Sequence, residues 1–184
     1  TYSTWPSGSN ALWVVNAGAA TLAQYKPSQL QQSGAPQATA TIGTGSVSLA
    51  AALDAEGRIW VSNFLDATVA AYSPAQLVGG GTPTPVVTLS GSALNDARGL
   101  VFDANGNLWV AERSLGTVIE YSASQLVDGG NVTPNITLSG TAFNGPAGLA
   151  SDDSGNLWVT NSWGGTVVEL TPDQLTASST PTPA

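Results

Sequence analysis

Short apolar runs separated by turn residues recur along the whole chain, and this pattern predicts β-strands rather than long helices. Within residues 97–139 the pattern predicts four strands, at about 99–103, 108–112, 117–121 and 135–139. An Asp-x-x-Gly turn at 103–106 separates the first two, because Asp caps such a turn and Gly accepts a positive φ. After the third strand, Ser73-Pro74 and Thr171-Pro172 in the equivalent segments predict one helical turn.

This unit of about 48 residues recurs four times. Four tryptophans, with spacings of 47, 49 and 49 residues, mark it: Trp13, Trp60, Trp109 and Trp158. The Asp-x-x-Gly turn precedes the last three, a strand that begins with Thr follows all four, and a Gln-Leu pair comes later in every unit. The boundaries fall at about 1–47, 48–96, 97–145 and 146–184.

A four-stranded antiparallel unit repeated at this period predicts an all-β chain with the β-propeller fold. We expect residues 1–184 to be a single propeller domain or a propeller segment. One blade cannot bury both of its faces, so neighbouring blades must pack together, and the repeated Trp would supply that contact. A solenoid is the main alternative, but solenoid repeats are usually shorter.

The fourth unit lacks an equivalent of the strand at 135–139, so the last blade is expected to lack its outer strand. Three explanations remain open: a four-blade ring without a closing strand, a piece of a larger ring, or association of chains, for example two halves that form eight blades. An open propeller would expose apolar blade faces. We therefore predict that the isolated chain is not a stable open monomer.

The amino-acid composition excludes several classes of function. Twelve acidic and four basic residues give a net charge of -8, so the chain lacks the basic clusters that nucleic acids or anionic membranes require. No apolar run is long enough for a membrane-spanning helix, so no membrane insertion is expected. The absence of His and Cys removes the commonest general base, metal ligands and nucleophile pairs. A surface rich in Ser, Thr and Asn favours an extracellular, cell-surface or periplasmic location.

Two segments, 99–112 and 148–161, resemble the NHL-repeat family, and their Gly-Asn-Leu-Trp-Val element is similar to streptogramin-lyase-like propellers. The resemblance implies a β-propeller whose relatives include enzymes and binding modules. Streptogramin lyases are associated with a His and magnesium, and this chain has no His. Gluconolactonase-like relatives bind calcium through Glu, Asn and Asp. The possible counterparts here, three residues after each Trp, are Asn16, Asn63, Glu112 and Asn161. These residues either hold Ca²⁺ or Mg²⁺ or hydrogen-bond the loops at the strand ends.

A second candidate site lies on the face formed by links between second and third strands and links between blades. Apolar residues are expected at turn tips there, with Asn, Asp and Arg among them. The candidates are Phe64, Leu65, Leu115, Trp163, Asn95, Asp96, Arg98, Arg113 and Asn144. This mixture suits a protein partner or a sugar stacked on Trp163, whereas ordinary loop packing is the alternative.

The leading hypothesis is a non-enzymatic binding or scaffold module without a cofactor, which binds a protein or a carbohydrate on this loop face. One alternative is a lactonase- or lyase-type enzyme that uses a divalent cation near Glu112. The other is a segment of a larger propeller or of a repetitive assembly, completed by self-association or by an additional segment.

Overall fold

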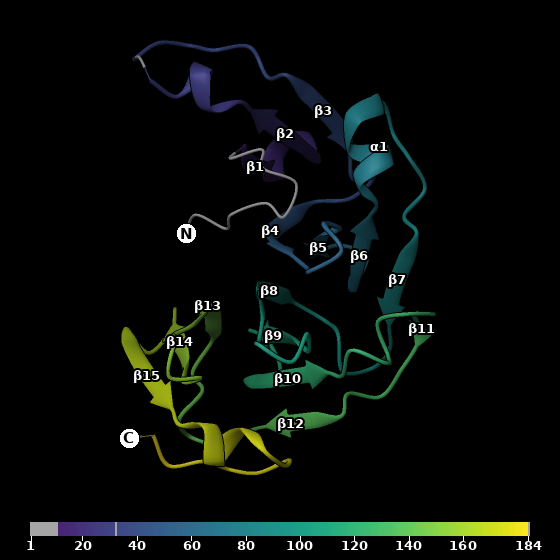
Figure 1. The fold of residues 1–184 in the computed structure, drawn as a ribbon. Helices are drawn as coiled ribbons and strands as arrows, with labels where there is room; N and C mark the ends of the chain where they lie inside the picture. Colours follow the sequence, from purple (N-terminus) through teal and green to yellow (C-terminus); the bar gives the residue numbers. More distant parts are fainter. Residues whose placement is uncertain (1–10, 32, 184) are drawn as a thin grey trace.

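The computed structural model describes residues 11–31 and 33–183, which form four sheets that follow one another around an open arc (Figure 1). The first sheet contains β1 (Leu12–Asn16), β2 (Thr21–Tyr25) and β3 (Ala40–Gly43). The second contains β4 (Ser48–Leu53), β5 (Ile59–Asn63), β6 (Thr68–Tyr72) and β7 (Val87–Ser90). The third contains β8 (Ala97–Phe102), β9 (Leu108–Glu112), β10 (Thr117–Tyr121) and β12 (Ile136–Leu138). The fourth contains β13 (Pro146–Ser151), β14 (Leu157–Asn161) and β15 (Thr166–Leu170).

Within each unit, neighbouring strands are antiparallel, as predicted, and the second sheet gains a fifth, parallel strand from the third unit. The strand expected at 99–103 begins two residues earlier, because Ala97 already pairs with Glu112 before a bulge shifts the register. None of the helices in the described ranges is long and apolar enough to cross a membrane.

The Asp of each Asp-x-x-Gly turn bonds both the backbone of its own turn and the indole N–H of the repeated Trp. In the second sheet, Asp54 Oδ1 accepts the Arg58 backbone N–H at 2.8 Å, and its Oδ2 accepts the Trp60 indole N–H at 2.7 Å. The third and fourth sheets have the equivalent indole bonds, from Trp109 to Asp103 and from Trp158 to Asp152. Asp152 therefore belongs to a structural turn.

In the first three sheets the repeated Trp packs against the following sheet, as predicted. It is buried there in the second and third sheets, whereas Trp13 of the first sheet is only partly buried. Trp60 is fully buried against Leu100, Leu108 and Val110 of the third sheet. Trp109 is buried in the same way against residues of the fourth sheet. Trp158, on the last sheet, is 38% exposed. The sheets thus stack face to face through large apolar contacts, and among the described residues the face of the fourth sheet that carries Trp158 remains open.

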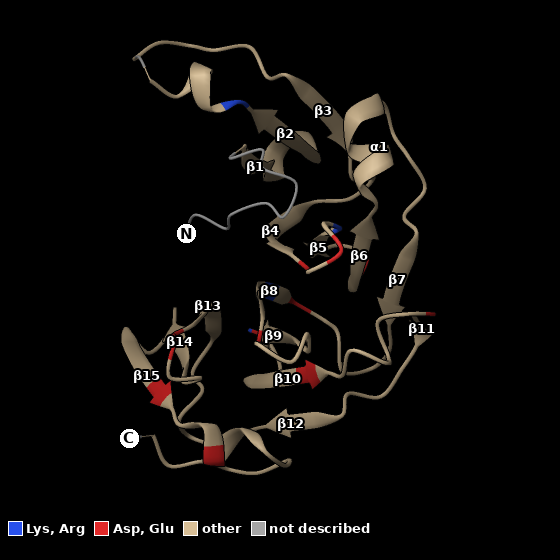
Figure 2. Ribbon diagram, in the orientation of Figure 1, with Lys and Arg blue, Asp and Glu red and all other residues tan. Residues whose placement is uncertain are grey.

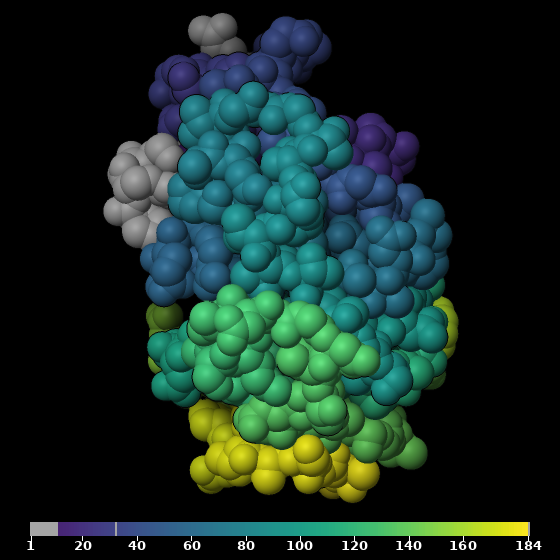
Figure 3. Space-filling model, turned by 90° about the vertical axis from the view of Figure 1, so that its right-hand side faces the viewer, coloured from purple at the N-terminus to yellow at the C-terminus, as the bar shows by residue number. Residues whose placement is uncertain are grey.

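Each outer strand is also held by the following unit, a contact that the repeat pattern did not predict. β11 (Gly130–Asn131), from the third unit, pairs in parallel with β7 of the second sheet. Equivalent bridges join Ile42 to Gly81 and Leu138 to Ser179. Figure 3 shows the resulting succession of units along the outer side of the molecule, from purple to yellow.

The predicted helical turn after the third strand is present in three units. It is an α-helix, α1, at Pro74–Gly79, and a 3-10 helix at Pro27–Gln29 and Pro172–Leu175. The third unit has only turns there. The reason is local: Ala123 replaces the Pro that presets φ at the first helical position.

Candidate functional site

The links between second and third strands bring predicted residues from three successive sheets together. The Arg98 guanidinium lies over the Phe64 ring, 5.0 Å from its centroid, and the Arg113 guanidinium lies 5.4 Å from the Trp163 centroid. Asp96 bonds both arginines. We call these five residues the arginine–aromatic cluster. It joins the second, third and fourth sheets, although its members are far apart in the sequence.

Asp96 is the centre of this cluster. Its side chain is buried, and Oδ1 accepts a hydrogen bond from Arg98 Nε at 2.6 Å. Oδ2 accepts from Arg113 Nε at 2.8 Å and from Ser114 Oγ at 2.9 Å. Burial alone would raise the pKa of Asp96, but the hydrogen bonds from Arg98, Ser114 and Arg113 outweigh it and hold the pKa below its ordinary value. Asp96 is therefore ionised between two cations.

Glu112 positions the link that carries Asp96. Its side chain is fully buried, and Oε2 accepts the backbone N–H groups of Asn95 at 3.0 Å and Asp96 at 2.9 Å. Among the described residues, Oε1 has no hydrogen-bond partner. Burial raises the pKa of Glu112 to about 7, and the two backbone N–H groups only partly oppose this effect. The carboxyl group thus changes charge near neutrality inside the protein.

The four residues predicted as metal ligands are engaged in local hydrogen bonds. Asn16 and Asn63 each donate to the Thr that opens the next strand, at 3.4 Å, and Asn63 also accepts from Ser48 Oγ at 2.8 Å. Asn161 donates to the Ala142 carbonyl at 2.9 Å. These contacts match the strand-end role that the sequence offered as the alternative. Over residues 11–31 and 33–183, no three His, Cys, Asp or Glu side chains gather as metal ligands would.

Trp163 and the remaining predicted residues form the rim of the face. The Trp163 ring, 59% exposed, lies against Gly145, where an added Cβ would be 2.7 Å from the ring. Asn144 accepts the Trp163 backbone N–H at 3.2 Å, so it holds the turn that carries the ring. Leu65 and Leu115 are exposed at the two other turn tips. Trp163 thus leans back over Gly145, which is the loop packing that the sequence offered as the alternative, whereas Leu65 and Leu115 are left open to solvent.

Sequence reasoning named the members of the arginine–aromatic cluster but not their pairing. Arg98 lies 34 positions from Phe64, and no local pattern links them. One signal was available: the chain has only four basic residues, and two of them lie at the two ends of the predicted strand pair 99–112, with Asp96 two positions before the first. Figure 2 shows how sparse charges are along the ribbon.

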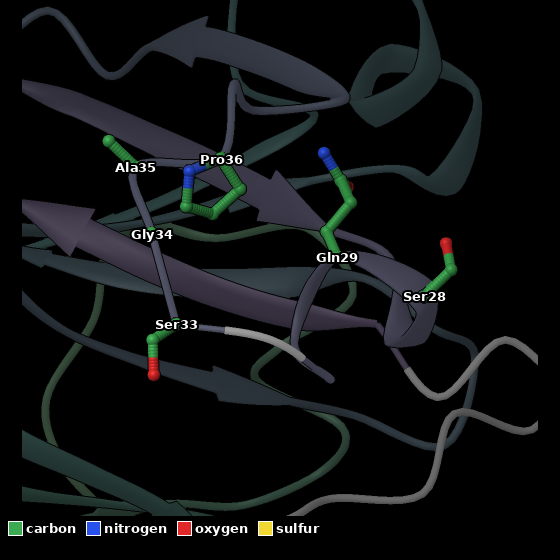
Figure 4. A pocket seen from close by; sticks show the side chains of 6 residues that line it. All are labelled: Ser28, Gln29, Ser33, Gly34, Ala35 and Pro36. Carbon is green, nitrogen blue, oxygen red and sulfur yellow. The ribbon is translucent and has the colours of Figure 1, made fainter.

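A hollow lies apart from this face, in the long connection between β2 and β3 (Figure 4). It has a volume of about 390 Å³ and is lined by Ser28, Gln29, Ser33, Gly34, Ala35 and Pro36. The Gln29 amide is already bonded to the Gln37 carbonyl and to Thr39. None of the residues predicted from the sequence as binding or metal ligands lines this hollow, and no charged residue does.

No family model matches the chain, and no curated protein matches it. Similar folds do occur among solved structures. Virginiamycin B lyase from Staphylococcus aureus superposes with a TM-score of 0.66 at 12% identity, over 94% of this chain and 52% of the lyase. The WD40 β-propeller domain of Doa1 superposes with a TM-score of 0.66 at 12% identity, over 96% of this chain and 51% of that domain.

A chain of the mitotic checkpoint complex superposes with a TM-score of 0.60 at 13% identity, over 96% of this chain and 48% of the other. This chain thus spans about half the length of these structures. At such low identity the likeness establishes architecture and not activity. The repeated antiparallel sheets and these superpositions together show that the chain has the β-propeller fold.

Proposed function

We propose that the protein is a β-propeller binding module that captures a protein or a carbohydrate on the face that carries the arginine–aromatic cluster. The observation behind this proposal is the cluster itself. Two of the four basic residues of a chain with net charge -8 are fixed there, beside the exposed ring of Trp163. Aromatic and Arg side chains are the residues most enriched at binding hot spots. The low charge of the chain also supports an extracytoplasmic location.

The similar structures include enzymes as well as a WD40 domain and a chain of the mitotic checkpoint complex, so they are compatible with a partner protein and do not distinguish binding from catalysis. Virginiamycin B lyase shows that the same fold also carries an enzyme. The finer relationship that the sequence suggests, to NHL-repeat and streptogramin-lyase-like propellers, is part of the proposal and rests on the Gly-Asn-Leu-Trp-Val element.

Peptide and glycan arrays probed with the purified chain test this function. Ligands that bind the chain should be lost by a double variant with Trp163→Ala and Phe64→Ala, because it removes both rings of the cluster. Val78→Ala is the matched control, since Val78 is 82% exposed on α1, outside the cluster. Ligands retained unchanged by the double variant would refute the loop face as the binding site.

The enzymatic alternative places a divalent cation at Glu112. The observation that favours it is a carboxyl group whose pKa lies near 7, which suits proton transfer at neutral pH. Full burial and two backbone hydrogen bonds oppose it. Thermal unfolding with and without Ca²⁺ or Mg²⁺ tests whether a cation binds at Glu112. A cation that raises the Tm of the wild type but not that of Glu112→Gln supports the enzymatic alternative.

A third proposal concerns assembly. We propose that a second copy of the chain covers the open face of the fourth sheet. Trp158 is 38% and Val167 61% exposed, whereas the equivalent Trp60 and Val69 are fully buried by the next sheet. In the stack, the sheet face that covers a repeated Trp carries a Leu or Ile and a Val on its second strand. β1 offers the same pattern through Leu12 and Val14, and Leu12 is 42% exposed.

A further inference from the structure

The two arginines of the cluster are fixed in place with most of their donors unused. Each bonds Asp96 through Nε, and over the described part of the chain neither Nη1 nor Nη2 has a protein partner. The side chains of Arg98 and Arg113 are 22% and 28% exposed. A guanidinium group presents its donors in a rigid fork that matches an oxyanion. Because Asp96 immobilises both forks, little side-chain entropy remains to be lost on binding.

The aromatic rings orient these cations. A guanidinium group lies over the ring of Phe64 and over that of Trp163, and Trp163 also packs on Gly145. Trp163 is 59% exposed, but the Arg113 guanidinium and Gly145 already lie against its ring, so a stacked sugar would compete with them for the ring faces. The groups left for a ligand are the guanidinium donors and the apolar turn tips at Leu65 and Leu115, which are 67% and 44% exposed.

The charge of the cluster selects the kind of ligand. Within its five residues, two guanidinium groups against one ionised carboxylate leave the cluster positive, although Asp66 follows Leu65 on the adjacent link and the whole chain is strongly negative. An approaching acidic group therefore gains from local charge and from charge-assisted hydrogen bonds. An adjacent apolar side chain of the same ligand would cover Leu65 or Leu115.

We infer that the cluster binds carboxylate side chains of an acidic protein segment in which acidic and apolar residues are interspersed. This inference rests on the proposed function and names the ligand class of that site. Arg98 and Arg113 each take one carboxylate through Nη donors, while Asp96 keeps their orientation. No group is transferred and no bond is formed or broken.

A labelled peptide of alternating Glu and Leu is the direct probe, with the same peptide carrying Gln for Glu as its control. We expect fluorescence anisotropy to show binding of the Glu peptide alone, weakened as salt rises. Arg98→Gln and Arg113→Gln should each reduce affinity roughly tenfold or more, the range for one charge-assisted contact.

Arg58→Gln is the matched control for these variants. Arg58 also bonds an Asp, at 2.6 Å from Asp54, and also lies over a Trp ring, 5.3 Å from the Trp60 centroid, but at the turn between β4 and β5. The Arg58→Gln variant should leave peptide affinity unchanged. Near-UV circular dichroism checks that every variant is folded.

Equal binding of the Gln peptide, or affinity that persists in both cluster variants, would overturn the inference. So would an acidic sugar polymer, oligogalacturonate, that binds the wild type but neither cluster variant while the Glu peptide does not bind. In these cases array ligands that depend on Trp163 and Phe64 would still support the proposed function. If no array ligand depends on the two rings, the proposed function itself fails.

Discussion

Residues that depart from the repeat carry the unusual chemistry of this protein. Glu112 stands where the other units have Asn16, Asn63 and Asn161, and it is fully buried with a pKa of about 7. Asn161 uses its amide oxygen to accept the Asn144 N–H, as Glu112 does for Asn95. The carboxyl group thus fills a role that a neutral amide fills elsewhere.

Replacing Glu112 by Gln should remove a pH dependence of stability. The folded-state pKa of about 7 lies above the ordinary 4.5, so the stabilising effect of the protonated form is complete below pH 4.5 and is lost as the pH rises through 7. By the free energy of a pKa shift this loss is about 3 kcal/mol. Urea unfolding between pH 4.5 and 8 should show a flatter profile for Glu112→Gln.

Asp153→Asn is the control for that series, because Asp153 is exposed on its turn. Its profile should run parallel to that of the wild type. A Glu112→Gln profile that keeps the wild-type slope would contradict the assignment of the pH dependence to Glu112.

Backbone strain differs between units at one turn position. Ala67 adopts a φ of 51°, and the equivalent residues in the third and fourth units are Gly116 and Gly165, at 63° and 62°. A non-Gly residue pays a steric cost in this left-handed region. Ala67→Gly should therefore raise stability by about 0.5–1 kcal/mol, after the entropy of the added Gly is subtracted.

The reverse change, Gly165→Ala, should lower stability by a similar amount, because a Cβ there meets nothing within 4 Å and only the strain changes. Thermal unfolding of Ala67→Gly and Gly165→Ala measures the two changes in stability. Shifts of the same sign for the two variants would be incompatible with this explanation.

At the scale of the elements, the recurring Gln holds each outer connection. Gln76 Oε1 accepts the Ser73 backbone N–H at 2.9 Å, and its Nε2 donates to the Thr84 carbonyl at 2.6 Å. The Gln of the other three units makes the same link to a carbonyl eight residues further on. The Gln76 side chain thus connects the residue after the third strand of the sheet to the segment that precedes the fourth strand.

Gln76→Ala should destabilise the second sheet by about 1–3 kcal/mol, since it removes two hydrogen bonds, one of which is the capping-box bond from the Ser73 backbone N–H at the start of α1. Gln31→Ala, at an exposed position, is the comparison and should change little. Hydrogen exchange should show faster exchange of the Val87 and Leu89 amides on β7. Unchanged protection of β7 in Gln76→Ala would contradict this role.

The strands and the Trp contacts could be predicted because both follow from local pattern and repetition. The turn at Asp103 and the helical turn at Pro74 were readable for the same reason. The parallel pairing of β11 with β7 could not be read, because Gly130 and Asn131 carry no strand signal. The cluster around Asp96 was only partly readable, since its pairing depends on how three sheets stack.

At the scale of the whole molecule, the apolar face of the fourth sheet stays open over the described residues. On the fourth sheet Val167 is 61% exposed, whereas the equivalent Val69 and Val118 are completely buried. Burying a Val or Trp of this kind stabilises by roughly 2 kcal/mol. The arc in Figure 1 shows the fourth sheet at one end of the stack, with no described sheet beyond it.

Sedimentation over a range of concentrations should therefore show association of the chain. A variant with Trp158→Asp and Val167→Asp should sediment as a monomer, because two carboxylates cannot be buried in that interface. Trp163→Ala is the control, since it changes an exposed Trp on the loop face instead. A wild-type chain that stays monomeric and unfolds cooperatively at all concentrations would rule out the second copy.

The indole N–H resonances of the six tryptophans provide the most direct test of the central claim, that the loop face binds and the repeated tryptophans are structural. The chain is titrated with an array ligand and followed by ¹H–¹⁵N correlation spectra. The Trp163 resonance should shift first and most, while those of the buried Trp60 and Trp109 stay in place. A ligand that shifts Trp158 or the buried pair and leaves Trp163 unmoved would contradict the account.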